Sequence, residues 1–174
     1  RMFGSPARSA RAGAPSSSYL RDWVYGGIDG AVTTFAIVAG VIGAELSSRV
    51  VLILGVANLV ADGFSMAAGN YSSTKTEHEE QAHLRAIEER HIEAVPEGER
   101  EEIRQIFRGK GFRGRDLQRA VDVITADRDR WVDTMLAEEY GLPKAVRSPR
   151  KAAASTFASF VLCGAVPLVP FLVG

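Results

Sequence analysis

The sequence predicts an all-α membrane protein, in which a bundle of transmembrane helices carries a highly charged helical insert. Three apolar stretches, residues 24–44, 50–71 and 152–174, are each long enough to cross a bilayer core, which takes about 20 helical residues. Most charged residues lie between residues 72 and 151, and the third apolar stretch contains none. The sequence shows no alternating strand pattern and no internal repeat. A water-soluble enzyme is therefore disfavoured.

The N-terminal part is expected to lie in the cytoplasm. Residues 1–19 are rich in Ser, Ala, Gly and Arg and lack acidic residues, which predicts a disordered basic tail. Residues 20–71 hold the first two transmembrane helices. More arginines precede the first span than lie in the turn after it, so the positive-inside rule places the N-terminus in the cytoplasm. Two crossings return residues 72–151 to that side, and residues 152–174 form the third transmembrane helix.

The cytoplasmic insert is expected to contain three helices. No turn signal separates the second span from the polar segment after it, so this helix should continue to Val95, where Pro96 begins the next one. A second helix is predicted over residues 97–108, because glycines follow it. A third is predicted over residues 115–140, ending before Gly141.

Ionisable residues inside the spans are the most informative feature, because a charge at the bilayer centre costs at least about 2.5 kcal/mol. Asp29 and Asp62 are such residues, and Asn58, Asp62, Met66 and Asn70 recur every four residues along one helical face. Hydrogen bonding between helices explains the two asparagines. For Asp29 and Met66 we favour a pathway role, since a carboxylate and a thioether suit a transition metal better than Mg²⁺ or Ca²⁺. For Asp62 both interpretations stay open.

The first two insert helices carry carboxylates at helical spacing. Glu88 and His91 form the Glu-x-x-His pattern of di-iron bundles, but those need two such motifs and two further glutamates. Glu99 and Glu102 continue the apolar stripe of the second helix and are expected to point toward its packed side. Glutamates in a first turn are most often partners of the helix dipole. These residues are therefore candidate metal ligands, but the glutamates of the first turn can also be explained as partners of the helix dipole.

The third insert helix places Glu139 one turn beyond Met135 on its apolar stripe. Such a methionine usually belongs to the core. A thioether and a carboxylate on one face can also bind a metal ion.

Composition excludes other classes. The net charge is zero, so no overall field draws nucleic acid to the protein. The single Cys163 excludes an intrachain disulfide and a four-cysteine zinc site. The GxGxxG spelled by residues 109–114 follows no strand, which argues against a dinucleotide site.

Several runs of sequence stand out together: GGIDGAVTTFAIVAG, ADGFSMAAGNYSS, and VPEGEREEIRQIF followed by KGF and WVDTMLAEEYGL. In order and spacing they resemble the vacuolar iron transporter family, also called the VIT or CCC1-like family. The resemblance covers about residues 20–174. It implies a five-span membrane fold, a homodimer and a cytoplasmic metal-binding domain formed by the insert.

The resemblance also implies roles for individual residues. Asp29 and Met66 match the family's transport site, and its metal-binding domain matches Glu88, Glu99, Glu102, Met135 and Glu139. His91 stands where a second glutamate is expected and could still bind metal. Leu136 stands where a second methionine is expected and cannot. Binding strength or metal preference is therefore expected to differ.

The chain is expected to be a fragment, because it stops after the third span and does not begin with Met. The homodimer is carried over from the resemblance. Gly26 and Gly30 have the small-xxx-small spacing that allows close helix approach, which is compatible with such pairing.

The sequence and the resemblance together predict a transporter, not an enzyme, that exports Fe²⁺ from the cytoplasm, with Mn²⁺ and similar ions as further substrates and no prosthetic group. The resemblance implies that protons are exchanged in return. Metal would pass from the insert to Asp29 and Met66. The membrane would be the plasma membrane in a bacterium, or the vacuolar or another organelle membrane in a eukaryote. The alternative is a membrane-anchored metal buffer or sensor, whose spans only tether the insert. A ferroxidase-like enzyme ranks third.

Overall fold

The computed structural model describes residues 19–143 and 147–173, which are helical apart from short connections. The helices are α1 (Leu20–Gly43), α2 (Ser48–Ala94), α3 (Pro96–Gly109), α4 (Gly114–Thr125), α5 (Arg128–Glu139), α6 (Pro149–Ala165), the 3₁₀ helix η1 (Val166–Leu168) and α7 (Val169–Val173). The described residues contain no strand, so the all-α fold class is confirmed. Of the expected basic tail, residues 1–19, only Tyr19 lies within the described residues.

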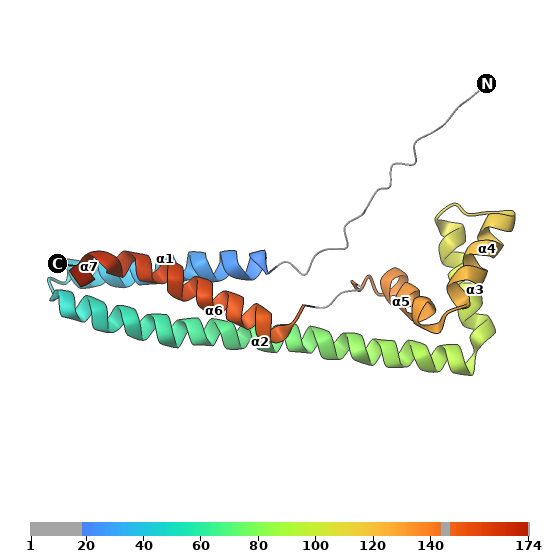
Figure 1. Cartoon of the computed structure of the whole chain (residues 1–174), viewed down its shortest axis with the longest axis horizontal. Helices are drawn as coiled ribbons and strands as arrows, with labels where there is room; N and C mark the ends of the chain where they lie inside the picture. The colour runs from blue at the N-terminus through green and yellow to red at the C-terminus, as the bar shows by residue number, and fades with distance from the viewer. Residues whose placement is uncertain (1–18, 144–146, 174) are drawn as a thin grey trace, which may run out of the picture.

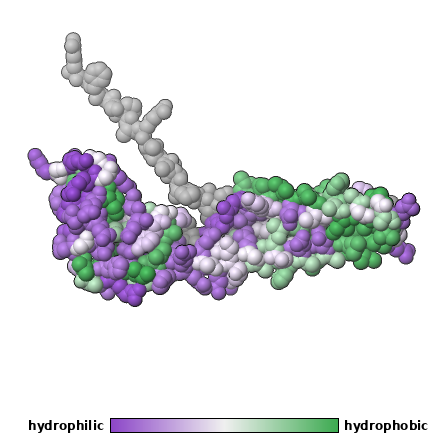
Figure 2. All heavy atoms as spheres, turned by 180° about the vertical axis from the view of Figure 1, so that it is seen from behind, coloured by the Kyte–Doolittle hydropathy of each residue, from purple (hydrophilic) through white to green (hydrophobic). Residues whose placement is uncertain are grey.

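Three helices are long and apolar enough to cross a membrane: Leu20–Gly43, Ser48–Ala94 and Pro149–Leu172. In Figure 1, α1 and α6 lie along the first part of α2, while α3, α4 and α5 gather near its other end. On the face shown in Figure 2, hydrophobic residues predominate on the bundle and hydrophilic residues predominate on the insert. Large apolar side chains such as Ile28, Phe35, Ile53 and Phe64 are exposed on the bundle, as expected of a surface that faces lipid. The predicted three-span membrane bundle is confirmed.

Glycines bring α1 and α6 into backbone contact. A Cβ atom at Gly26 would clash with the Thr156 carbonyl oxygen, and one at Gly30 would clash with the Phe160 carbonyl oxygen. The small-xxx-small spacing therefore does allow close helix approach, as predicted. The partner helix belongs to the same chain, however, so these glycines are engaged within one protomer and their spacing does not support two-fold pairing.

α2 is a single helix of 47 residues that runs from the bundle into the insert. It ends at Ala94, and Pro96 occupies the first turn of α3. Proline suits this position because its missing N–H would have no partner in a first helical turn. The predicted end of the long helix and the predicted second insert helix are both confirmed.

The predicted single helix over residues 115–140 is wrong, because the structure divides it into α4 and α5. Asp127 has an extended backbone, and its side chain accepts a hydrogen bond from the Arg130 backbone N–H at 2.8 Å. An aspartate in this position satisfies a donor that a new helix leaves unpaired, so it favours a helix start. The insert therefore comprises α3, α4 and α5 with the second half of α2, and not three helices.

The insert has an apolar core of its own. Ile103 from α3, Val121 from α4 and Met135 from α5 are fully buried there, with Ile92 of α2 beside them. The apolar stripe expected on the third helix lies in this core despite the break, because both halves keep the same face toward α3 and α2. This core sets the relative positions of α2, α3 and α5, which carry the candidate metal ligands of the insert.

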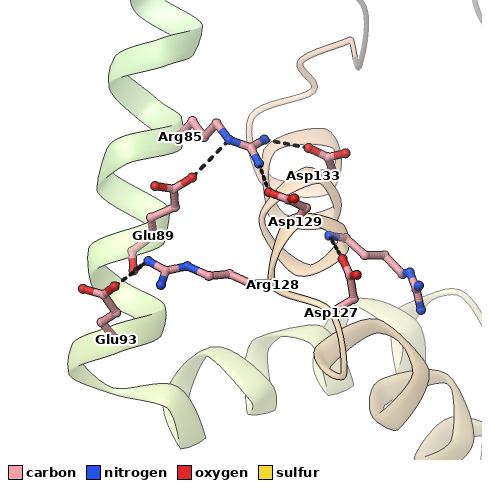
Figure 3. Close-up of polar contacts among 8 residues, drawn as sticks. Arg85, Glu89, Glu93, Asp127, Arg128, Asp129 and Asp133 are labelled. Carbon is pink, nitrogen blue, oxygen red and sulfur yellow. Dashed lines mark hydrogen bonds and ion pairs between the residues drawn. The ribbon is translucent and has the colours of Figure 1, made fainter.

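Arginines fasten α5 to α2 outside this core (Figure 3). The Arg85 guanidinium donates to Asp129 at 2.6 Å and Asp133 at 2.7 Å on α5, and it also bonds Glu89 on its own helix. Arg128 pairs with Glu93 at 2.6 Å. A network of this kind contributes more than isolated surface pairs do.

Candidate metal sites

Two glutamates of the insert are buried and form no ion pair with a lysine or arginine in the described part of the chain. Glu88 of α2 is 1% exposed, and Glu99 in the first turn of α3 is 8% exposed. One oxygen of each carboxyl, Oε2, is buried without a hydrogen-bond partner. Burying a carboxylate oxygen without a partner is unfavourable. These two oxygens therefore mark a place where a cation would be stabilised.

His91 lies between the two buried glutamates. Its Nδ1 atom is 3.9 Å from an oxygen of Glu88 and 3.8 Å from an oxygen of Glu99, which is too long for hydrogen bonds. The His91 side chain is 55% exposed, so it can reach water as well as both carboxyls. Imidazole is a common metal ligand. The histidine thus stands at the open side of the glutamate pair.

The electrostatics show that more carboxyls share this region. Burial raises the pKa of Glu99, and the negative charges of Glu102 and Glu88 raise it further, whereas His91 opposes them. Partial burial of its carboxyl likewise raises the pKa of Glu139, followed by the charges of Glu88 and Glu102. Four glutamates therefore repel one another here, and a bound cation would relieve that repulsion.

Tyr140, directly after Glu139, holds one oxygen of Glu88. Its hydroxyl donates to Glu88 Oε1 at 3.0 Å. Burial raises the pKa of Tyr140 to about 12, and the hydrogen bond and charge of Glu88 act in the same direction. The hydroxyl therefore stays protonated and keeps Glu88 oriented, while the second oxygen of that carboxyl stays without a partner.

The remaining predicted insert ligands lie at different depths. Met135 is fully buried in the apolar core, next to buried Leu136, as a structural methionine would be. Glu102 and Glu139 are exposed. The charge of Glu102 nevertheless acts on buried Glu99 and on Glu139, so Glu102 lies at the solvent edge of this group of carboxyls. No group of three or more His, Cys, Asp or Glu side chains in the described residues is already arranged to hold a metal ion. The glutamate carboxyls of the insert lie near one another, but their side chains would have to move to coordinate an ion together.

In the bundle, two hydrogen bonds fix how α1 and α2 lie against each other. Asn58 of α2 donates to Thr33 of α1 at 3.3 Å, and Asn70 of α2 donates to Asp22 of α1 at 3.1 Å. The helices are antiparallel, so moving one turn along each from the first pair places Asp29 of α1 opposite Asp62 of α2. We call this facing row of polar side chains the α1–α2 column.

Asp29, Asp62 and Met66, the three predicted pathway residues, all lie on the α1–α2 column and are partly buried. Neither aspartate side chain forms a hydrogen bond or ion pair with another described residue; the Thr33 hydroxyl instead donates to the Asp29 backbone carbonyl at 2.8 Å. Between the column's insert-side end and Asp29 an open pocket of about 340 Å³ is lined by Arg21, Asp22, Tyr25, Met66, Asn70 and Thr156. The column thus offers unpaired carboxylates next to a thioether and a pocket.

The sequence-based interpretation missed Asp22 and Arg147. Asp22 is 5% exposed, and the Arg147 guanidinium contacts both of its oxygens, at 3.0 and 3.1 Å. The Asn70 amide bridges Asp22 to Thr156 of α6, to which it donates at 2.7 Å. One signal pointed to Asp22, because it lies two helical turns before Asp29 and so on the same face. Nothing in the sequence paired it with Arg147, which is 125 positions away.

Comparison with known proteins decides the family. The sequence model of the VIT family matches residues 20–174. This chain belongs to the VIT family. The resemblance inferred from the sequence motifs is thereby confirmed.

Curated relatives of this VIT-family chain carry names that state a function. A "Vacuolar iron transporter" of Toxoplasma gondii is 39% identical over 160 residues, which cover 90% of this chain and 53% of that protein. "Vacuolar iron transporter 1" of Arabidopsis thaliana is 34% identical over 156 residues, which cover 88% of this chain and 62% of that protein. "Vacuolar iron transporter 1" of Oryza sativa is 33% identical over 160 residues, which cover 90% of this chain and 63% of that protein. This VIT-family chain thus spans between half and two thirds of the length of these relatives.

Proposed function

We propose that this VIT-family chain is part of a transporter that moves Fe²⁺, and other divalent transition metals such as Mn²⁺, out of the cytoplasm. The observation that carries the proposal is the α1–α2 column, in which helix geometry puts Asp29 opposite Asp62 near the Met66 thioether, and neither carboxyl has a hydrogen-bond or ion-pair partner among the described residues. Ionised side chains within spans are energetically costly, and those that occur there commonly mark ion pathways. Relatives named as iron transporters support the metal as the substrate.

The insert would capture the metal before it enters the column. Its glutamates, Glu88, Glu99, Glu102 and Glu139, repel one another while no cation is bound. His91 would complete the ligand set where this chain departs from the family pattern. Met135 would have to leave the core to join them, so we assign metal capture first to the carboxyls and the imidazole.

Proton exchange would follow from the chemistry of the column. A carboxyl between membrane helices is neutral when protonated and binds a cation when ionised. Asp29 or Asp62 could therefore take up a proton as the metal leaves and release it when the next metal arrives. This exchange would couple metal export to proton import, with the insert and the N-terminus on the cytoplasmic side.

The test is Fe²⁺ uptake by proteoliposomes that contain the chain and an internal pH-sensitive dye, under anoxic conditions. Uptake with a coupled pH change, abolished by Met66→Ala, supports transport through the column. The matched control is Ser65→Ala, because Ser65 is the exposed neighbour of Met66 on α2. Equal uptake by Met66→Ala and Ser65→Ala would remove the column from the pathway.

A membrane-anchored metal buffer is the second candidate, because the gathered insert glutamates would bind metal even without transport. A buffer binds Fe²⁺ without moving it. Stoichiometric binding with no uptake in the same assay would therefore favour the buffer. Pairing into a homodimer, which the family resemblance implies, is tested by the mass of the purified complex in detergent.

A further inference from the structure

We propose that Asp22 is a further metal ligand at the insert-side mouth of the α1–α2 column, and that Arg147 is a tethered cation that occupies Asp22 until a divalent metal displaces it. This inference rests on the proposed function, since it assigns the first residue that a metal meets in the column. It concerns a carboxylate and an arginine that neither the sequence motifs nor the family resemblance singled out.

The position of Asp22 fits a mouth ligand. It lies on α1 at the end of the column nearest the insert, where Asn70 fixes the helix register. It lines the same pocket as Met66, so an ion at Asp22 has open space toward the thioether. An ion that comes from the insert therefore meets a buried carboxylate before it reaches Asp29.

The contacts of Asp22 suit a cation of more than one charge. Its carboxyl is almost completely buried and receives hydrogen bonds from Asn70 and from Arg147. In this surrounding a single guanidinium supplies one positive charge, whereas a divalent ion supplies two in a smaller volume. The Asn70 amide nitrogen donates to both Asp22 and the Thr156 hydroxyl, and the Asn70 side-chain oxygen accepts from Thr74, so two further oxygen atoms belong to the same hydrogen-bond network and are of a kind that binds divalent ions.

Arg147 would keep a second acidic partner if it left Asp22. While Nη1 contacts Asp22, its Nη2 atom already lies 3.7 Å from Glu77 of α2, whose side chain is 54% exposed. Arg147 precedes α6 and belongs to no helix, and the Ser148 backbone N–H donates to the Tyr19 hydroxyl beside it. The backbone can therefore stay in place while the guanidinium releases Asp22 and remains with Glu77. The structure shows the mouth with Arg147 on Asp22, and the proposed open state keeps only the contact to Glu77.

The test is Fe²⁺ binding by the whole chain in detergent without oxygen, measured by equilibrium dialysis. Glu99→Gln and Glu102→Gln are present throughout, so that the insert contributes little. We expect Arg147→Gln to tighten Fe²⁺ binding by at least about tenfold, because a neighbouring positive charge is removed. Arg147→Lys should bind nearly as the parent does. In an Asp22→Asn background Arg147→Gln should have no effect.

Unchanged or weaker binding by a folded Arg147→Gln variant would overturn the proposal, since a purely structural ion pair predicts that result. If Arg147→Gln fails to fold, Glu77→Gln decides instead. Removing the second carboxylate should hold Arg147 on Asp22 and weaken Fe²⁺ binding several-fold, and an unchanged affinity would overturn the proposal. Binding does not require flux, so a chain that shows these affinities without uptake would refute transport and leave the mouth site intact.

Discussion

The helices of the insert meet through side chains, whereas in the membrane bundle α1 and α6 approach closely enough for backbone contact. In the insert, Arg85 spans from α2 to two aspartates of α5, and bulky apolar residues fill the core. In the bundle, Gly26 and Gly30 bring α1 against α6. The difference follows from the solvent, because between lipid-exposed helices there is no water to drive apolar burial.

The largest effect is expected from adding one methyl group to the glycine contact. Gly30→Ala should destabilise the bundle by about 3 kcal/mol or more, because the new Cβ meets the Phe160 backbone, which cannot move alone. Gly40→Ala on the same helix is the matched control, since nothing lies within 4 Å of its Cβ position. Thermal unfolding in detergent measures both. Equal melting temperatures would mean that α1 and α6 do not touch as described.

The next effect concerns metal capture by the insert. Glu99→Gln combined with Glu102→Gln should weaken Fe²⁺ binding at least about tenfold, because two of the four mutually repelling carboxyls become neutral. Glu97→Gln with Glu101→Gln is the control pair, as both of these glutamates lie on the same helix outside the cluster. Calorimetry on the whole chain gives the affinities. A loss of the same size in the control pair would refute the assignment.

A smaller effect is expected in the arginine network of Figure 3. Arg85→Ala should lower stability by roughly 1 kcal/mol and speed hydrogen exchange in α5, because three carboxylates lose one shared partner. Arg90→Ala is the control, since the one bond of Arg90 to the described residues runs to the Ala86 carbonyl of its own helix. The network would not hold α5 on α2 if hydrogen exchange in α5 became faster in the Arg90 variant, or stayed as slow as in the parent in the Arg85 variant.

The smallest effect is a dependence on pH. Burial raises the pKa of Glu99 above 4.5 in the folded protein, so its ionisation opposes folding at pH 7. This penalty shrinks as the pH falls through the raised pKa and is absent below 4.5. Metal-free Glu99→Gln should thus melt a few degrees above the parent at pH 7, with the difference narrowing at pH 5. If the difference in melting temperature between Glu99→Gln and the parent were larger at pH 5 than at pH 7, the assigned direction of the Glu99 pKa shift would be wrong.

The sequence was sufficient for features that depend on local pattern. Apolar length located the spans, and Pro96 located the end of α2. The break at Asp127 was missed because an apolar stripe with helical spacing continues across it, and only the capping hydrogen bond reveals the new start. The pairing of Asp22 with Arg147 was missed because it is tertiary and joins residues at opposite ends of the chain.

The candidate ligands likewise fall into those that local spacing identified and those whose position depends on tertiary packing. Helical spacing identified Glu88, His91 and Glu99 as candidates, and the structure brings them together. Spacing allowed both a core position and a ligand role for Met135, and the structure places it in the core. Spacing could not show that Tyr140 holds Glu88, because that contact depends on how α5 packs on α2.

The most direct measurement compares initial Fe²⁺ uptake by proteoliposomes carrying Asp29→Ala with uptake by those carrying Glu102→Ala. The α1–α2 column predicts that Asp29→Ala abolishes uptake, whereas Glu102→Ala weakens metal capture by the insert and leaves part of the uptake. Undiminished uptake by Asp29→Ala would contradict a metal pathway through the column.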